Sequence, residues 1–209
     1  MNEVAAPRIS HERAAVTVVV GLALAGAAIG ALWAWIAPPV HGVIALTKSG
    51  DHVHAALGSE SDNFFIAAVL LVGMAVVLAV VTAVLVWQWR PHRGPVLCAA
   101  LGLGSAAAFG VAAGVGALIV RARYDVIDLA GAAISPEHRV VYVTEAPPVF
   151  FSHSGWLIAA SVLFPVALAM LAYALIAVST SRDDLGGWPP EEPILPAPIR
   201  VDGVLPSAR

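Results

Sequence analysis

The chain has 209 residues, of which 59% are hydrophobic and only 12% are charged, and its net charge is −3 at pH 7. Soluble domains carry about 25% charged residues, so this composition excludes an ordinary soluble domain. The slightly negative charge gives no reason to expect nucleic-acid binding. The single cysteine, Cys98, has no second cysteine with which to form an intrachain disulfide. A sequence rich in alanine, valine, leucine and glycine is typical of membrane helices that pack closely through small residues.

Four apolar segments are each long enough to cross a bilayer as a helix, which takes about 20 residues. They lie at about residues 14–37, 63–89, 94–120 and 154–178. We therefore predict an all-α membrane protein, with a four-helix transmembrane domain over residues 1–178 and a Pro-rich cytoplasmic tail over 179–209. A cleaved signal peptide is a less favoured interpretation of the first segment, because that segment exceeds the roughly 7–15 apolar residues of a signal-peptide core.

The ends of the first two helices carry local signals. Trp33 and Trp35 suit a membrane–water interface, where an apolar ring and a polar N–H both find partners, and Pro38 and the proline after it end the helix. Asp62 or Asn63 is expected to cap the second helix, because either side chain can accept a hydrogen bond from a free N–H of the first turn.

The third helix is expected to extend beyond its apolar segment. Arg121, Asp125 and Asp128 follow one another at i, i+4 and i+7, a spacing that places all three on one helical face. We therefore expect about two further turns, ending near Gly131.

Two loops on the outer side carry strand signals. Residues 43–47 and 52–54 flank a segment of turn composition at 48–51, which predicts a β-hairpin. Residues 139–144 read R-V-V-Y-V-T and are the clearest strand candidate in the chain. We expect this strand to pair with the hairpin in a small extracytoplasmic β element that caps the bundle.

A short turn at Trp87–Pro95, with the sequence W-Q-W-R-P-H-R-G-P, joins the second and third apolar segments. Its prolines and glycine break the helix on both sides. Arg90, His92 and Arg93 are its strongly polar residues, and we interpret them as a positive anchor on the cytoplasmic side. Contact with lipid head groups or with a cytoplasmic ATPase is the alternative.

The positive-inside rule predicts the orientation, because lysine and arginine concentrate in cytoplasmic loops. With both termini inside, the cytoplasmic segments hold Arg8, Arg13, Arg90, Arg93, Arg182, Arg200 and Arg209, and the outer loops hold Lys48, Arg121, Arg123 and Arg139. We therefore predict a multi-pass protein of the inner (plasma) membrane with cytoplasmic N- and C-termini.

Recognisable reaction chemistry is missing from the sequence. No apolar segment contains an ionisable acid, base or histidine, and the chain has no Walker A, H-E-x-x-H or G-x-S-x-G motif. We expect no enzyme, no cofactor and no metal. The histidines of the outer loops are His41, His52, His54, His138 and His153.

Two readings of these histidines remain alternatives. His52 and His54 on one face of a strand could begin a metal site, but scattered loop histidines are the favoured interpretation. An enzyme acting at the outer surface would need His52, His54, His138 and Glu145 to cluster.

Four glycines have the spacing that lets helices approach closely. Gly26 and Gly30 form one G-x-x-x-G pair and Gly110 and Gly114 form another. We predict packing faces at both pairs, either inside the bundle or against another subunit.

Several short motifs resemble a known family. They are E-S-D-N-F-F at residues 60–65, W-R-P-H-R-G-P at 89–95, the Gly/Ala-rich third segment and the Pro-rich tail. The pattern resembles small actinobacterial four-helix membrane proteins of unknown function and is similar to the LucB-type accessory subunits of Mce lipid importers. The resemblance implies a non-catalytic accessory subunit that stabilises or regulates an ATP-driven lipid or fatty-acid import complex. Its partners would be the permease and other subunits, together with membrane lipids.

The alternative hypothesis is a self-contained membrane carrier or lipid-binding protein, possibly homodimeric. This hypothesis predicts an internal cavity that reaches the middle of the membrane and opens to lipid or water, whereas a tightly filled bundle would count against it.

Overall fold

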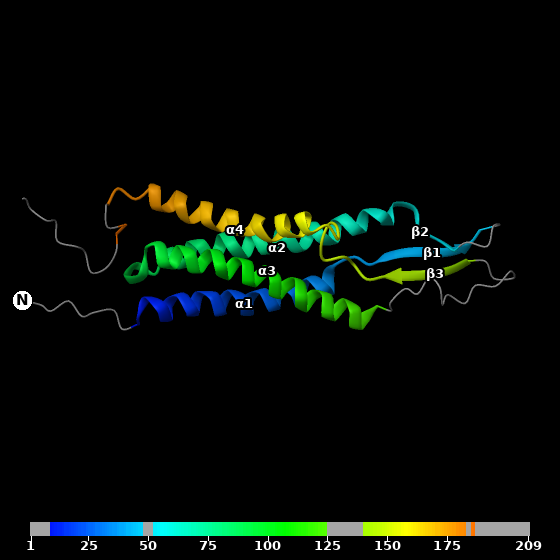
Figure 1. Cartoon of the computed structure of the whole chain (residues 1–209), viewed down its shortest axis with the longest axis horizontal. Coiled ribbons are helices and arrows are strands. Elements are labelled where there is room, and N and C mark those ends of the chain that lie inside the picture. The colour runs from blue at the N-terminus through cyan, green and yellow to red at the C-terminus, as the bar shows by residue number, and fades with distance from the viewer. Residues whose placement is uncertain (1–8, 48–51, 125–139, 183–184, 187–209) are drawn as a thin grey trace, which may run out of the picture.

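A computed structural model of the chain describes residues 9–47, 52–124, 140–182 and 185–186 (Figure 1). Four long helices lie side by side along the long axis, and a three-stranded sheet continues beyond one end of them. We call that end the sheet end. The opposite end, where the second helix connects to the third, is called the turn end.

The four helices are α1 (His11–Ile36), α2 (Asp62–Trp87), α3 (Pro95–Arg123) and α4 (Gly155–Val178). Each is long and apolar enough to cross a membrane. The predicted number of helices and their approximate positions are therefore confirmed. Short 3₁₀ turns, η1 (Gly58–Ser61) and η2 (Arg90–His92), precede α2 and α3.

Local sequence determines most helix ends. Ser10 caps α1, since its side chain accepts a hydrogen bond from the N–H of Arg13 at 3.3 Å. At the other end Ala37 is extended (ψ 129°) before Pro38, as expected for a residue that precedes proline. Gly94 has a φ of 142°, which other residues rarely adopt, and Pro95 then occupies the first turn of α3.

Two predicted helix ends are wrong. The residue before α2 is Ser61, which makes no side-chain cap, and Asn63 instead donates its side-chain N–H to the carbonyl of Pro39 at 3.0 Å. Helix α3 ends at Arg123, because Tyr124 is already extended (ψ 137°). The predicted continuation of the helix toward Gly131 is therefore wrong. The acidic residues at 125 and 128, predicted to share a helical face with Arg121, lie outside the described residues.

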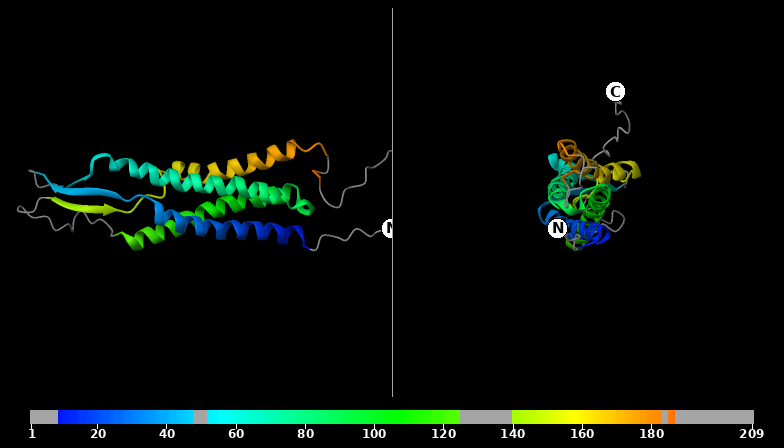
Figure 2. Two further views of the ribbon diagram at one scale, coloured as in Figure 1. Left: turned by 180° about the vertical axis from the view of Figure 1, so that it is seen from behind. Right: turned by 90° about the vertical axis from the view of Figure 1, so that its left-hand side faces the viewer.

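Helices α1 and α3 form the closest pair, and Figure 2 shows them running side by side. They run parallel, since both begin at the turn end. A Cβ added at Gly26 or Gly30 would clash with the backbone carbonyls of Ala108 or Ala112. Because glycine has no side chain, the two backbones can come into contact. Small residues stabilise helix pairs in lipid in this way.

Trp33 is part of the bundle core and not of an interface belt, which corrects the prediction. Its ring is fully buried and lies against Gly116, where an added Cβ would come within 2.7 Å of it. Its N–H donates a hydrogen bond to the carbonyl of Ala67 in α2 at 2.7 Å. Trp35, 76% exposed, retains the position expected of an interface aromatic.

Helix α2 turns a stripe of small residues toward the core, although its sequence is rich in valine and leucine. Six buried positions recur every four residues, namely Ala67, Leu71, Ala75, Ala79, Ala83 and Trp87, and Ala68 and Val86 are buried beside them. Many of its valines and leucines lie on the exposed side. Helix α2 therefore packs against the core through a narrow stripe of small residues and has an apolar outer face.

The small sheet contains β1 (Val40–Leu46), β2 (His52–Ala56) and β3 (Val140–Glu145) in the order β2-β1-β3, with both pairs antiparallel. The predicted hairpin and its pairing with the later strand are confirmed. Val40 and Ile44 are buried on one face, whereas Tyr142 lies 75% exposed on the other. The alternation follows the two-residue period of a half-buried sheet.

Candidate functional site

A cavity of about 630 Å³ lies toward the sheet end between α3, α4 and residues 146–154, which join β3 to α4. We call it the α3–α4 cavity. Figure 1 shows that α2 and α3 extend beyond the start of α4, so the connecting segment, and not a helix, faces α3 here. Its volume falls within the roughly 300–1,000 Å³ of small-molecule sites.

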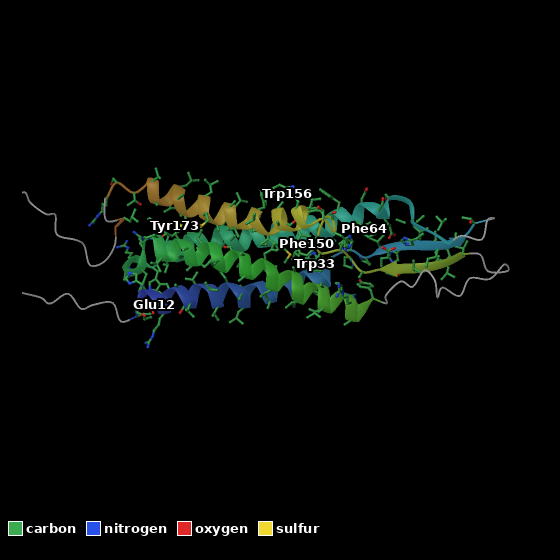
Figure 3. The ribbon with its side chains drawn as sticks, in the orientation of Figure 1. Glu12, Trp33, Phe64, Phe150, Trp156 and Tyr173 are labelled. Carbon is green, nitrogen blue, oxygen red and sulfur yellow. The ribbon has the colours of Figure 1, made fainter. Side chains whose placement is uncertain are left out.

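Apolar side chains form most of the cavity wall. Phe64 and Phe150, labelled in Figure 3, both line it. Phe109 is fully buried beside the cavity, with its ring centroid 6.1 Å from that of Phe150. Trp156, by contrast, is 76% exposed and points outward from α4. The aromatic wall is typical of sites that enclose an apolar ligand.

The cavity is bounded by a face of α3 that has no large side chains. Gly110 and Gly114 line the cavity, and a Cβ added at either would have no atom within 4 Å. Ala117 continues the same wall. Any larger side chain at the two glycines would project into space that is now empty.

Three of the described lining residues are strongly polar, namely Arg121, Ser152 and His153, and none of the described lining residues is an acid. Twelve residues separate Phe109 from Arg121 on α3, a rise of about 18 Å at 1.5 Å per residue. The cavity is therefore elongated along the helix, and Arg121 lies at its sheet end.

The two glycine pairs named from the sequence have different surroundings. Gly26 and Gly30 face α3 and bring α1 into backbone contact with it. Gly110 and Gly114 contact no other element and are exposed toward the cavity. The structure thus brings the first pair into a helix interface and leaves the second pair open.

The turn between α2 and α3 holds the N-terminal segment. His92 is 2% exposed, and its Nε2 donates a hydrogen bond to the carbonyl of Ile9 at 2.9 Å. Its ring centroid lies 5.1 Å from that of His11 and 4.9 Å from that of Trp89. His92 is thus a buried structural residue, which contradicts its interpretation as part of an exposed anchor.

The same turn holds the C-terminal segment through Arg93. Its guanidinium donates to the carbonyls of Trp87 at 2.8 Å and Leu185 at 2.7 Å, and it stacks 4.4 Å above the Trp87 ring centroid. Desolvation, and then the charge of Arg90, lower the pKa of Arg93. Arg90 itself is exposed, so it alone keeps the geometry of a plain surface anchor.

Tyr173 of α4 completes this arrangement. Its hydroxyl accepts a hydrogen bond from the N–H of Gly94 at 3.2 Å, and its ring packs edge-on against Trp87 with centroids 5.2 Å apart. The turn therefore contacts α4 as well as both terminal segments, and it acts as the assembly point of the turn end.

Histidines of the sheet end form pairs with glutamates. His41 donates its backbone N–H to Glu60 at 2.6 Å, and its Nδ1 lies 2.7 Å from the same carboxylate oxygen. The bond from the backbone N–H is the main cause of the lowered pKa of Glu60 in η1. His54 of β2 pairs with Glu145 of β3.

Within the described residues no group of three histidine, cysteine, aspartate or glutamate side chains could hold a metal ion. The position 138 histidine, named for a possible surface enzyme, lies outside them. Of the other members of that hypothetical cluster, the structure brings His54 and Glu145 together as partners across the sheet.

No motif in the sequence predicted the cavity. One signal was present: Gly110, Gly114, Ala117 and Arg121 are spaced at i, i+4, i+7 and i+11, which places a smooth strip and one cation on a single face of α3. The opposite wall, at residues 146–154, has no periodicity that would reveal where it lies.

Four helices of this length and composition indicate a multi-pass membrane protein, here a bundle with a small sheet at one end and a lateral cavity beneath it. The chain belongs to the family DUF2567, described as protein of unknown function, whose model matches residues 22–187.

Mycobacterial proteins are similar to this chain over most of its length. An uncharacterized protein of Mycobacterium tuberculosis (strain H37Rv) is 51% identical over 176 residues, covering 84% of this chain and 91% of the relative. One from Mycobacterium leprae is 49% identical over 175 residues, covering 84% and 88%. No solved structure gives a significant match.

Proposed function

We propose that this protein is a non-catalytic membrane protein that binds one membrane amphiphile in the α3–α4 cavity. The observation that carries the proposal is the elongated cavity, whose wall is mostly apolar and includes Phe109, with the cation Arg121 at the sheet end of α3. An amphiphile has the same division between an apolar chain and a polar head. Binding sites for such ligands are concave and mostly apolar, with a few polar groups that set orientation.

The position of the cavity supports this function. It begins near the middle of α3 and ends at the last turn of that helix, so a chain lying in it would run roughly along the bilayer normal. With both termini cytoplasmic, the sheet end would lie outside and the cavity would open at the outer leaflet. The charge distribution of the sequence favours this orientation.

The accessory-subunit role in a lipid importer has weaker support. It depends on the resemblance of short motifs, and the family and relatives described above name no transport complex. The cavity gives a specific reason to favour the lipid-binding alternative, since a subunit that only braces a larger complex would not need one. Both roles remain compatible if the bound amphiphile is passed to a partner.

Photocrosslinking of the full chain in lipid nanodiscs tests the proposal. The probe is a long-chain fatty acid with a photoreactive group in its chain, and labelled peptides are located by mass spectrometry. We expect labelling on α3 between Phe109 and Arg121 and on residues 146–154. Gly114→Leu fills the cavity from a position with no neighbour within 4 Å, so it should reduce labelling about tenfold without unfolding the chain.

Gly73→Leu is the matched control. Gly73 is also an exposed helical glycine with no atom within 4 Å of an added Cβ, but it lies on α2 and does not line the cavity. Wild-type labelling in Gly73→Leu supports the proposal. Equal labelling of the wild type and both variants, spread over all four helices, would mean that the probe reports only surrounding lipid and would refute it.

A further inference from the structure

We propose, on the basis of the function proposed above, that the ligand of the α3–α4 cavity is a single-chain amphiphile with an anionic head group. The head group would be a carboxylate or a phosphate held by Arg121. This inference names the chemical class of the ligand, whereas the proposed function requires only an amphiphile.

The first argument is the charge of the polar end. Arg121 is an exposed cation on the last turn of α3 and lines the cavity. In the part of the chain that the structure describes, no acid lines the cavity and no ion pair of Arg121 is recorded. A guanidinium binds the planar carboxylate or the phosphate through two parallel N–H bonds. A cation that has no acidic partner among the described residues favours an anionic ligand over a neutral one.

The neighbouring arginine shows that this position is specific. Arg123 is also exposed and lies two residues along α3, but it does not line the cavity, and its guanidinium lies 5.5 Å from the centroid of the Tyr124 ring. Two cations of the same helix end thus have different surroundings. Only Arg121 is placed to meet a head group whose chain lies between α3 and α4.

The second argument is the volume of the cavity. The cavity of about 630 Å³ lies within the range of sites that bind one small molecule, roughly 300–1,000 Å³. One long acyl chain with a small head group is a ligand of this size class. We therefore propose a fatty acid or a lysophosphatidate as the ligand.

Equilibrium binding to the full chain in nanodiscs tests this inference, with empty nanodiscs as the baseline. Three radiolabelled probes share one chain length: palmitate, palmitoyl lysophosphatidate and hexadecanol. We expect at least one anionic probe to bind about tenfold more tightly than the neutral alcohol, as the loss of charge-assisted hydrogen bonds implies. The comparison of palmitate with lysophosphatidate identifies the head group as carboxylate or phosphate.

Matched variants separate the role of the charge from that of the cavity. Arg121→Gln should weaken the anionic probe about tenfold and leave hexadecanol binding unchanged, whereas Arg123→Gln should leave both unchanged. Equal binding of acid and alcohol by the wild type, or equal loss in both arginine variants, overturns the head-group inference. The proposed function survives that result if Gly114→Leu still weakens binding of all three probes about tenfold. It fails separately if Gly114→Leu binds them as the wild type does.

Discussion

The indole N–H of Trp33 in α1 donates a hydrogen bond to the backbone carbonyl of Ala67 in α2, with 2.7 Å between the nitrogen and the oxygen. Both residues are fully buried. Trp33 therefore links α1 to α2 while its ring packs on Gly116 of α3. One side chain thus joins three of the four helices near the sheet end.

Replacing this indole should destabilise the bundle. Trp33→Phe removes the donor and leaves a smaller ring, so we expect a loss of about 1–3 kcal/mol in the free energy of unfolding. Denaturation of the purified chain by sodium dodecyl sulfate in mixed micelles would measure it. Trp35→Phe is the control, since Trp35 is 76% exposed and its replacement should change the midpoint little. Equal midpoints for the two variants would contradict the role assigned to Trp33.

The backbone contact between α1 and α3 should not tolerate even one methyl group. A Cβ at Gly26 would clash with the carbonyl of Ala108, so Gly26→Ala should push the helices apart and destabilise the chain by about 1–3 kcal/mol. Gly21→Ala, one turn earlier on the same helix, meets no atom within 4 Å. It should leave stability unchanged or raise it slightly, because alanine favours a helix. Thermal unfolding followed by circular dichroism compares the two variants with the wild type. A midpoint for Gly21→Ala lower than that of Gly26→Ala would exclude the packing explanation.

Loss of the Arg93 side chain should release the segment that follows α4. Arg93→Gln removes the hydrogen bond to the Leu185 carbonyl and the stacking on Trp87, and charged hydrogen bonds of this kind contribute about 1.5–3 kcal/mol. The N–H of Leu185 donates a hydrogen bond to the carbonyl of Arg182. Hydrogen exchange at this amide should accelerate about tenfold or more. Arg90→Gln removes an exposed charge from the same turn and should leave that exchange rate as it is.

Gly42 allows His54 and Glu145 to meet across the central strand of the sheet. A Cβ at Gly42 would lie 2.7 Å from Nε2 of His54, so Gly42→Ala should separate this pair and loosen β2 from β1. Faster hydrogen exchange in β2 is the expected result, measured by mass spectrometry of the peptide that contains it. Gly155→Ala, at a glycine with open surroundings, is the control. Unchanged protection of β2 in Gly42→Ala would show that the pair does not need the glycine.

The contact between η1 and β1 should weaken in acid. Glu60 has its pKa lowered from an ordinary value of 4.5, mainly because its carboxylate accepts the backbone N–H of His41. A lowered folded-state pKa means that the contribution is complete above pH 4.5 and is lost as the pH falls through the folded value. Protection of the His41 amide against exchange should therefore decrease in acid, at a pH below 4.5. Glu60→Gln should show weak protection at every pH, and a pH dependence that persists in Glu60→Gln would assign the effect to another group.

The helices and strands and their order follow from local properties of the amino-acid sequence. Runs of uncharged residues longer than a bilayer is thick must form helices in lipid, because no other structure there satisfies the backbone of a single segment. Ser10, Pro38, Gly94 and Pro95 mark helix ends through bonds and dihedral angles that involve only nearby residues. The three strands were predictable for the same reason, since alternation and turn composition are local properties.

The different roles of residues that share one local pattern depend on how the helices pack. Gly26 and Gly110 have the same spacing motif, yet one packs on a helix backbone and the other opens into a cavity. Trp33 and Trp35 lie two residues apart on α1, yet Trp33 packs against other helices and is buried, whereas Trp35 is exposed. The α3–α4 cavity depends on where α4 begins relative to α3 and on the path of residues 146–154 between them. These are packing relations between segments far apart in the chain, and no local pattern records them.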